Sequence, residues 1–367
     1  MKLVFYSNFL NDHQLPLCLE FVKLLGEGNF YFVAHEEISR ERLNLRFDDM
    51  NEKYPFVIKS YKGGQEESIA QDLMLEADVV IIGSCRNMPF EERMRLNKLT
   101  FKYSERILKK GDIYWFNPRL HRAIYRGWTK HKSKKLYTLC ASAYTARDLS
   151  LFGYPKDKCI PWGYFPEVKD YGNIENLFKI KYKSTNDAVT VLWVGRLIDL
   201  KHPDHAIKIA LKLKNDGYRF VLNIIGVGTM QSSLQKMIQD LNLQDCVHML
   251  GALPPSKVRE YMESSQIFLF TSDKNEGWGA VLNEAMNSGC AVIANINIGS
   301  VPFMLKDNEN ALIYSGDIDE LYNKVCSVFN DINLRQKLAE SAYLSMIEKW
   351  NAKVASQNFI SIANSLL

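Results

Sequence analysis

The sequence predicts an α/β protein with two doubly wound, mainly parallel sheets, each in a domain of its own. Short apolar runs of strand length alternate with segments of helical periodicity along the chain, a pattern typical of βαβ units. The 367 residues are enough for two such domains. A polar segment with Pro, Gly and Asn, Pro161–Lys183, precedes a new apolar run and predicts the boundary between them.

The first half of the chain contains three clear strand candidates. Lys2–Tyr6 predicts a strand, and His13–Leu25 predicts the helix after it. Asp78–Gly83 contains a continuous apolar run, as expected of a parallel strand that is buried on both faces. Lys135–Ala141 is a further strand of this kind. We therefore expect an N-terminal α/β domain over residues 1–165.

The second half repeats the alternation more regularly. In chain order, the expected strands and helices are Val189–Val194, Asp204–Leu213, Phe220–Ile225, Met230–Leu241, Cys246–Leu250, Pro255–Ser264, Ile267–Phe270, Ala280–Ser288 and Ala291–Ala294. Ile332–Leu367 predicts two helices. We expect a second α/β domain over residues 166–347 and a closing helix over residues 348–367. Since ligands of open α/β sheets bind at the carboxyl ends of strands, candidate residues should directly follow a strand.

The composition disfavours a membrane-spanning, a secreted or a zinc-binding protein. Hydrophobic residues make up 47% and charged residues 24% of the chain, which are ordinary values for globular proteins. No apolar run approaches the roughly 20 residues that span a bilayer, and the N-terminus turns polar too early for a signal peptide. The seven cysteines form no C-x-x-C pair and no cluster with zinc spacing. We expect a cytoplasmic protein with reduced, buried thiols and no metal site.

Basic residues concentrate in one stretch of the first domain. Lys102–Lys135 contains 11 basic and 2 acidic residues, interleaved with six Tyr, Trp and Phe side chains. Such a stretch suits an anionic surface: a bilayer face, a phosphate-bearing acceptor or nucleic acid. A solvated face with some buried aromatic residues is the alternative. Of these surfaces we expect an anionic membrane to be the partner, and we expect no nucleic acid.

Two loops of the second domain could hold phosphate. Gly195-Arg196 ends one strand and Lys201 follows five residues later, which places two cations at the carboxyl end of a strand, where a departing diphosphate could be stabilised. Gly226 and Gly228 end the next strand and would let the backbone approach a phosphate or a sugar closely. Each motif alone is also explained by surface cations or by a tight turn.

The segment Thr271–Met286 carries the most specific pattern. It follows the apolar strand Ile267–Phe270, and Glu276 lies in its glycine-containing loop. Glu284 lies eight residues later among small and apolar neighbours, in the helix that the loop opens. A carboxylate accepts hydrogen bonds from vicinal hydroxyls, so one glutamate suits a hexose and the other a ribose. The N-terminal amides of this helix would favour a phosphate or a sugar hydroxyl.

Taken in order, G-R-x4-K, G-x-G and E-G-x-G-x4-E-A resemble the retaining glycosyltransferases of the GT-B fold, family 4, over about Val191–Tyr314. The resemblance implies two Rossmann-like domains facing a central cleft. It implies that Arg196 and Lys201 bind the donor diphosphate and that Glu284 binds the ribose. Donor-binding residues by the same resemblance are Gly195, Gly226, Gly228, Leu250 beside the base, and Glu276, Gly277, Trp278 and Gly279 around the sugar. Trp278 stands where the family often has Phe.

The acceptor half departs from the family pattern. The loop after the first strand contains no glycine, and His13 and Gln14 are its candidates for an acceptor sugar. His13 could equally be a helix cap or a surface residue. A later histidine of the family has no counterpart after Gly83, and His121 in the basic stretch remains an alternative. We count His13 with Arg196, Lys201 and Glu276 as the candidate catalytic residues.

The resemblance implies a retaining hexosyl transfer from a nucleotide diphosphate sugar, UDP rather than GDP, to a glycan or lipid-linked acceptor in bacterial surface polysaccharide synthesis. It implies no metal and no cofactor, because the nucleotide sugar is a substrate. Alternatives are another GT-B enzyme, such as a nucleotide-sugar epimerase or a phosphorylase, and a non-catalytic sugar-nucleotide-binding protein. A dinucleotide-dependent oxidoreductase is disfavoured, since G-x-G-x-x-G follows neither domain's first strand.

Overall fold

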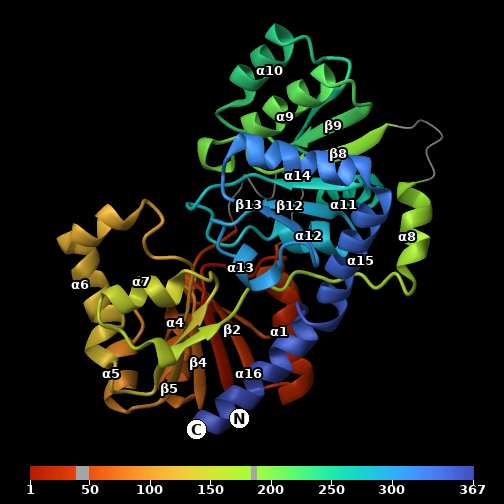
Figure 1. Ribbon diagram of the computed structural model, residues 1–367. Helices are drawn as coiled ribbons and strands as arrows, with labels where there is room; N and C mark the ends of the chain where they lie inside the picture. The colour runs from red at the N-terminus through yellow and green to blue at the C-terminus, as the bar shows by residue number, and fades with distance from the viewer. Residues whose placement is uncertain (39–48, 183–187) are drawn as a thin grey trace. The chain divides into compact units, whose positions relative to one another are not determined.

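The computed structural model describes residues 1–38, 49–182 and 188–367, so Lys183, the end of the predicted boundary segment, lies outside the described residues. Contacts between Cα atoms divide the chain into two compact units. Unit 1 comprises Met1–Glu167 and Asn351–Leu367, and unit 2 comprises Val168–Trp350. Each unit is built on one parallel sheet with helices packed against it (Figure 1).

Unit 1 contains a seven-stranded sheet in the order β3-β2-β1-β4-β5-β6-β7, and all of its pairings are parallel. The central strands are buried on both faces, which explains their continuous apolar sequences. The predicted strands near residues 2–6, 78–83 and 135–141 are confirmed as β1, β4 and β6. The strands are β1 (Leu3–Ser7), β2 (Phe30–Ala34), β3 (Val57–Lys59), β4 (Val79–Ile82), β5 (Leu99–Ser104), β6 (Leu136–Cys140) and β7 (Cys159–Pro161).

Side chains of β1 alternate between two packed faces of this sheet. Val4 and Tyr6 pack in one cluster with α4, while Phe5 packs against Phe32 on the other face. On that face Phe359 of the last helix contacts Phe21 of α1, and Figure 1 shows these two helices side by side. The helices are α1 (Leu15–Leu25), α3 (Met50–Lys53), α4 (Gly64–Glu76), α5 (Phe90–Arg95), α6 (Pro118–Gly127), α7 (Thr145–Leu151) and α16 (Ala352–Leu366), with short 3-10 turns η1 (Ser60–Lys62), η2 (Asp112–Phe116), η3 (Thr129–His131) and η4 (Lys156–Lys158).

Unit 2 contains a six-stranded parallel sheet in the order β10-β9-β8-β11-β12-β13. Strands β8, β9 and β11 have the bounds that the sequence predicts. Because β8 and β11 are neighbours, the loops after them share the same edge of the sheet. The strands are β8 (Val189–Val194), β9 (Phe220–Ile225), β10 (Val247–Gly251), β11 (Ile267–Phe270), β12 (Ala291–Asn295) and β13 (Leu312–Tyr314).

Helices cover both faces of this second sheet. Helix α9 contacts both α10 and α14, and α12 and α15 form a second layer with β12 (Figure 1). Both helices predicted in Ile332–Leu367 are present. The helices are α8 (Ile174–Lys181), α9 (Pro203–Asn215), α10 (Gln231–Asp240), α11 (Pro255–Ser264), α12 (Val281–Asn287), α13 (Val301–Met304), α14 (Ile318–Asn330) and α15 (Ile332–Glu348), with the turn η5 (Asp199–Lys201).

The basic stretch Lys102–Lys135 is partly internal. Lys102 lies on β5 with its ammonium 4.2 Å from the ring centroid of Trp128 and 4.6 Å from that of Phe90, and burial lowers the pKa of Lys102 to about 8. The solvated cations of the stretch are therefore fewer than the sequence indicates. Among the described residues, no helix is long and apolar enough to cross a membrane.

Candidate functional site

The loop between β8 and α9 carries the first pair of predicted cations. Arg196 is exposed, and within the described part of the chain its guanidinium has no hydrogen-bond or ion-pair partner. Lys201 ends the turn η5, and only 13% of its side chain is exposed. Gly195 lies between them and the strand, where an added Cβ would be 3.2 Å from both Lys201 and Trp193. The loop thus holds one free and one packed cation at the carboxyl end of β8.

Lys201 and Glu276 form an ion pair that joins this loop to the loop after β11. The side chain of Glu276 is also 13% exposed, and the hydroxyl of Ser272 donates to the same carboxylate oxygen at 3.1 Å. Thr271 links the same two loops, because its hydroxyl donates to the carbonyl of Lys201 at 2.7 Å. The indole of Trp193 in turn donates to Thr271 at 2.9 Å. These contacts fix the positions of both charged groups at the carboxyl edge of the sheet.

The remaining residues of the Glu276 loop divide between surface and core. Glu284 lies in the first turn of α12 and is half-buried. The ring of Trp278 is only 1% exposed; its Nε1 donates to Asn283 at 2.9 Å, and it packs against the ring of Trp350. The ring of Trp278 therefore belongs to the core of unit 2. Gly277 and Gly279 flank it, and Gly279 has a φ of 79°.

Gly226 and Gly228 allow two loops to approach each other. A Cβ at Gly226 would be 1.8 Å from the carbonyl oxygen of Gly195, and one at Gly228 would be 2.3 Å from that of Leu197. The amide of Leu197 also donates to Val227 at 3.0 Å. The close approach that glycine permits here is thus to the Arg196 loop, which the glycines help to position.

Leu250, predicted beside the base, lies at a bulge of the edge strand β10. Met249 and Gly251 pair with consecutive residues of β9, so Leu250 has no partner in the ladder. Its side chain is half-buried. The amide of Gly226 donates to the carbonyl of Gly251 at 2.8 Å, which ties the bulge to the glycine loop. The predicted donor-binding residues of β8, β9, β10 and β11 therefore lie along one edge of the second sheet.

Three residues directly after Lys201 are of metal-ligating type. Ligand atoms of His202, Asp204 and His205 lie within 4.8 Å of one another. The two imidazole rings, however, are stacked with centroids 4.6 Å apart and planes at 19°. Ring nitrogens direct their lone pairs in the ring plane, so these two rings do not converge on one ion in this arrangement. Asp204 also accepts from Lys208 at 2.7 Å. Burial lowers the pKa of His205 to about 4.

The predicted acceptor residues of unit 1 follow β1. The ring of His13 lies parallel to that of Tyr164, with centroids 6.4 Å apart, and its buried Nδ1 has no hydrogen-bond partner among the residues that the structure describes. Gln14 is buried and donates to Ser7 at 3.2 Å, so it is held within the loop. The alternative, His121, has its Nε2 2.5 Å from the carbonyl oxygen of Trp115 and packs in the η2–α6 region.

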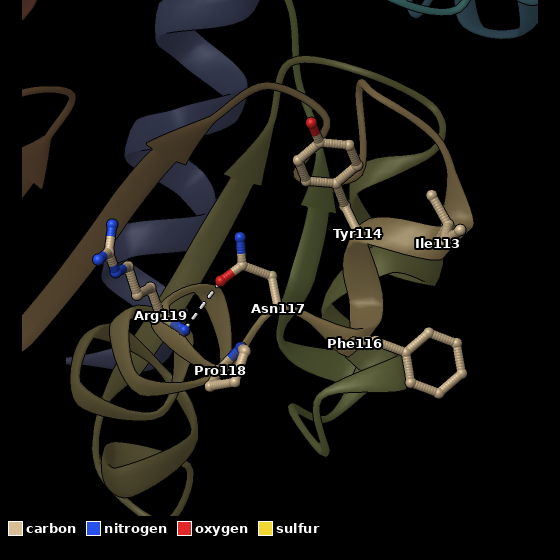
Figure 2. Close-up of a pocket in the computed structure, with 6 residues that line it drawn as sticks. All are labelled: Ile113, Tyr114, Phe116, Asn117, Pro118 and Arg119. Carbon is tan, nitrogen blue, oxygen red and sulfur yellow. Dashed lines mark hydrogen bonds between the residues drawn. The ribbon is translucent and has the colours of Figure 1, made fainter.

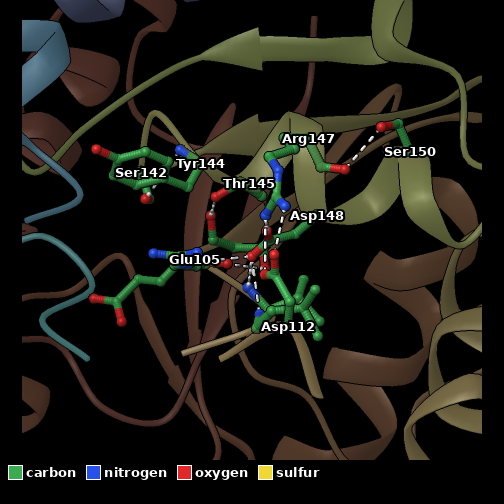
Figure 3. Close-up of polar contacts among 12 residues, drawn as sticks. Glu105, Asp112, Ser142, Tyr144, Thr145, Arg147, Asp148 and Ser150 are labelled. Carbon is green, nitrogen blue, oxygen red and sulfur yellow. Dashed lines mark hydrogen bonds and ion pairs between the residues drawn. The ribbon is translucent and has the colours of Figure 1, made fainter. Parts of the chain in front are cut away.

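A polar cluster after β5 was missed by the sequence argument (Figure 3). Glu105 and Arg106 directly follow this strand. Asp148 of α7 is fully buried and accepts from the amides of Ile107 and Leu108 at 3.1 and 2.9 Å. Burial raises the pKa of Asp148, while those amides and the nearby arginines oppose the shift. The available indication was a Glu-Arg pair at the end of a strand, but the polar side chains within β5 concealed that strand.

Arg147 and Arg106 both lie near Asp148 but differ in their contacts. Arg147 forms two hydrogen bonds to Asp112, at 2.6 and 3.1 Å, and Figure 3 shows its guanidinium directed at Asp112 and Asp148. Arg106 places its Nε 3.4 Å from Asp148 without hydrogen-bond geometry, and its guanidinium lies 4.7 Å over the ring centroid of Tyr144. Both arginines thus form ion pairs with Asp148, but in the described part of the chain the Nε of Arg106 makes no hydrogen bond.

Solved structures similar to the whole chain have the same fold. The Anabaena protein Alr3699/HepE, solved in complex with UDP and glucose, superposes with a TM-score of 0.69 at 14% identity, covering 100% of both chains. The lipopolysaccharide outer core galactosyltransferase WaaB in its apo form gives a TM-score of 0.70 at 15% identity, again over 100% of both chains. At this identity the likeness shows the fold, which is GT-B with two Rossmann-like domains.

Curated relatives match part of this chain. The amylovoran biosynthesis glycosyltransferase AmsK of Erwinia amylovora is 30% identical over 151 residues, which are 39% of this chain and 37% of that protein. The poly(ribitol-phosphate) alpha-N-acetylglucosaminyltransferase of Staphylococcus aureus is 28% identical over 207 residues, which are 54% of this chain and 40% of that protein. The matches thus span less than half the length of these two relatives.

The sequence model of one family covers the edge of the second sheet on which the predicted donor residues lie. It is described as glycosyl transferases group 1 and matches residues 174–345, a segment that includes the Lys201–Glu276 pair and Glu284. Residues 174–345 of this chain therefore belong to the family of glycosyl transferases group 1.

Proposed function

We propose that this protein is a retaining glycosyltransferase of family 4. It moves a hexose from a nucleotide diphosphate sugar, UDP-linked rather than GDP-linked, to a glycan or lipid-linked acceptor of a bacterial surface polysaccharide, without a metal or a cofactor. The relatives named above supply the polysaccharide context, and the UDP and glucose in the HepE complex support the donor class. Enzyme activity, donor and acceptor are all parts of this proposal.

The single observation that carries the proposal is the Lys201–Glu276 pair at the carboxyl edge of β8 and β11. Both side chains are 13% exposed, and the exposed Arg196 belongs to the same loop as Lys201. In the free protein each charge of the pair satisfies the other. A diphosphate sugar offers both groups better partners, because its phosphates attract Lys201 and Arg196 while its hydroxyls donate to Glu276.

In the proposed reaction the bond between the sugar C1 and the diphosphate oxygen breaks. A hydroxyl of the acceptor forms the new bond to C1 from the same face, and the departing phosphate oxygen takes the hydroxyl proton. Arg196 and Lys201 stabilise the charge that develops on this oxygen. Glu276 and the backbone of Gly277–Gly279 orient the hexose, Glu284 binds the ribose, and His13 contacts the acceptor.

A donor panel tests this function. The purified protein is titrated with UDP, GDP and their hexose derivatives, and slow hydrolysis of each sugar nucleotide is followed. We expect binding and hydrolysis of a UDP-hexose, and a loss of binding of at least tenfold in Arg196→Ala. Lys236→Ala, an exposed cation on α10, is the matched control. Absence of binding and of turnover across the panel contradicts the proposal, and binding without turnover favours a non-catalytic sugar-nucleotide-binding protein.

We further propose that unit 1 binds an anionic membrane, where a lipid-linked acceptor would lie. The surface is the η2–α6 patch, made of exposed apolar and basic side chains around an open hollow of about 640 Å³ (Figure 2). Ile113 is 74% and Phe116 73% exposed, which makes them the most exposed large apolar side chains in the described part of the chain. Arg119, Arg122 and Arg126 are exposed on the adjoining helix. Apolar insertion beside basic residues is how proteins bind anionic bilayers.

Liposome flotation tests the membrane proposal. We expect the protein to float with vesicles of phosphatidylglycerol and phosphatidylcholine and to float less with phosphatidylcholine alone. Ile113→Asp with Phe116→Asp should abolish flotation, and the double change of Arg122 and Arg126 to Gln should weaken it by about 2 kcal/mol. Ile332→Asp, at a 48% exposed position of unit 2, is the control. Equal flotation of all variants refutes the proposal.

A further inference from the structure

Five side chains converge where the strands of unit 1 end, and we call them the carboxyl-edge cluster: His13, Glu105, Arg106, Tyr144 and Tyr164. They follow β1, β5, β6 and β7. The ring of His13 lies against Tyr164, whose hydroxyl donates to Glu105 at 2.6 Å. Arg106, the next residue, covers the ring of Tyr144 at 4.7 Å. Since ligands of open parallel sheets bind at this edge, the cluster is placed to bind one.

Arg106 has unused hydrogen-bonding capacity within this cluster. Its side chain is 9% exposed, and its Nε is buried without a hydrogen-bond partner. Over residues 1–38, 49–182 and 188–367, neither of its terminal nitrogens has a hydrogen-bond partner. A guanidinium carries five N–H donors, and donors left unsatisfied in a buried position cost free energy. Arg106 therefore forms an ion pair with Asp148 at 3.4 Å, while its N–H donors remain available to an acceptor group of a ligand.

The neighbouring charged groups already have partners. Arg147 pairs with Asp112 at 2.6 Å, and Lys109 pairs with Glu105. Asp148 accepts two backbone amides and forms an ion pair with Arg106 at 3.4 Å that lacks hydrogen-bond geometry. The unused N–H donors thus distinguish Arg106 from Arg147 and Lys109.

A second unsatisfied atom belongs to the same cluster. Within the described residues, Nδ1 of His13 is buried and has no hydrogen-bond partner, and its ring lies parallel to that of Tyr164 with centroids 6.4 Å apart. Aromatic faces of this kind suit the C–H face of a sugar ring, while a guanidinium fork matches the two oxygens of a phosphate or a carboxylate. Together they fit a ligand that combines a sugar ring with an anionic group.

We propose that Arg106 binds a phosphate or carboxylate of the acceptor, with the sugar ring of that acceptor beside His13 and Tyr164. The identification of this ligand as the acceptor substrate rests on the proposed function. The binding of an anionic sugar does not, because the site lies wholly within unit 1. It predicts that the protein binds anionic sugars, either sugar phosphates or uronates, in preference to neutral sugars. Arg106 would then determine which acceptors the protein accepts.

Ligand titration followed by NMR tests the proposal on the full-length protein. The probes are glucose 1-phosphate, glucuronate and glucose, each added with and without saturating UDP, so that occupation of the nucleotide site by a phosphate is recognised. We expect at least tenfold tighter binding of one or both anionic probes than of glucose. Tighter binding of the phosphate alone or of glucuronate alone supports the proposal and identifies the class of anion.

The variants are Arg106→Gln, Arg106→Lys and the control Arg147→Gln. Arg106→Gln removes charge-assisted hydrogen bonds, so we expect a loss of about 10- to 100-fold for the anionic probes, with glucose unaffected. Arg106→Lys should lose less, and Arg147→Gln should bind like the wild type. UDP binding, measured in each variant, reports the proposed donor site separately, and far-UV circular dichroism reports folding.

Two results overturn the inference. One is equal affinity of all three probes, including no binding of any. The other is anion binding that survives Arg106→Gln. If that binding is also lost when UDP is added or when Arg196 is replaced by Ala, the anion occupies the nucleotide site.

Discussion

Replacement of Glu276 by Gln separates the sugar from the nucleotide in the proposed donor site. The side chain keeps its size and one hydrogen-bond acceptor, but it loses the charge that pairs with Lys201. In a bound donor, a carboxylate that accepts two sugar hydroxyls contributes roughly 1.5–3 kcal/mol for each bond. Because the amide oxygen of Gln still accepts one of these bonds, the loss is about 1.5–3 kcal/mol, which corresponds to roughly 10- to 100-fold in kcat/KM for the UDP-hexose.

The same change should leave the nucleotide bound. UDP alone has no hexose for Glu276 to contact, and Lys201 no longer has to leave an ion pair before it meets the diphosphate. We therefore expect Glu276→Gln to bind UDP as tightly as the wild type or more tightly, whereas Lys201→Met should bind UDP about 10- to 100-fold more weakly. Calorimetry with UDP and a coupled assay of UDP release measure the two quantities.

Folding must be measured beside these quantities. Both side chains of the pair are 13% exposed, so an unpaired Lys201 should destabilise the free protein by about 1–3 kcal/mol. In a domain of roughly 150–250 residues this lowers Tm by about 2–4 °C for each kcal/mol. Glu260→Gln, which breaks an exposed pair with Lys257, is the control. Turnover of Glu276→Gln within threefold of the wild type refutes the reasoning, and an equal loss of UDP binding shows that Glu276 acts only through Lys201.

Three further predictions concern the elements that support the site. Gly228→Ala places a Cβ 2.3 Å from the carbonyl of Leu197, so chemical denaturation should show a loss of about 1–3 kcal/mol; wild-type stability would contradict this. Trp278→Phe removes the donor to Asn283 and should lower Tm while changing the donor KM by less than threefold, since the ring is buried; a large KM change would place it in the donor site. Burial lowers the pKa of His205 in the folded protein from 6.5 to about 4. As the pH falls from 6.5 towards 4, the unfolded state therefore binds a proton that the folded state does not, and the free energy of unfolding should fall. His205→Gln should reduce that fall, and an unchanged pH profile would refute the assignment.

The sequence predicts the second sheet better than the first for a physical reason. Strands β8, β9 and β11 are mainly apolar runs, of which β8 and β9 end at a glycine and β11 lies between Gln266 and Thr271, so their limits are visible as changes of composition. Strand β5 contains Lys102, whose buried stem and ammonium lie on aromatic rings, and a lysine in a linear sequence indicates a solvated surface. Because β5 is not among the predicted strands, Glu105 and Arg106 are not among the candidates either, since candidate residues are sought directly after a predicted strand.

For the candidate site, too, the sequence predicts which residues take part but not the contacts and the burial of their side chains. The positions of Glu276 and Lys201 follow from their spacing after two strands, but their mutual ion pair does not, since it depends on β8 and β11 being neighbours. Trp278 lies within the donor motif, yet its ring is in the core. Gly226 and Gly228 are explained by the approach of a second loop, which no local pattern reveals.

A structure determined with a bound UDP-hexose tests the central claim most directly. The account predicts the diphosphate within hydrogen-bonding distance of Lys201 and Arg196, and two hexose hydroxyls on the carboxylate of Glu276, with the Lys201–Glu276 ion pair opened or shared. The nucleotide bound at another edge of either sheet, or bound beside an unchanged Lys201–Glu276 pair with no contact to the sugar, would contradict it.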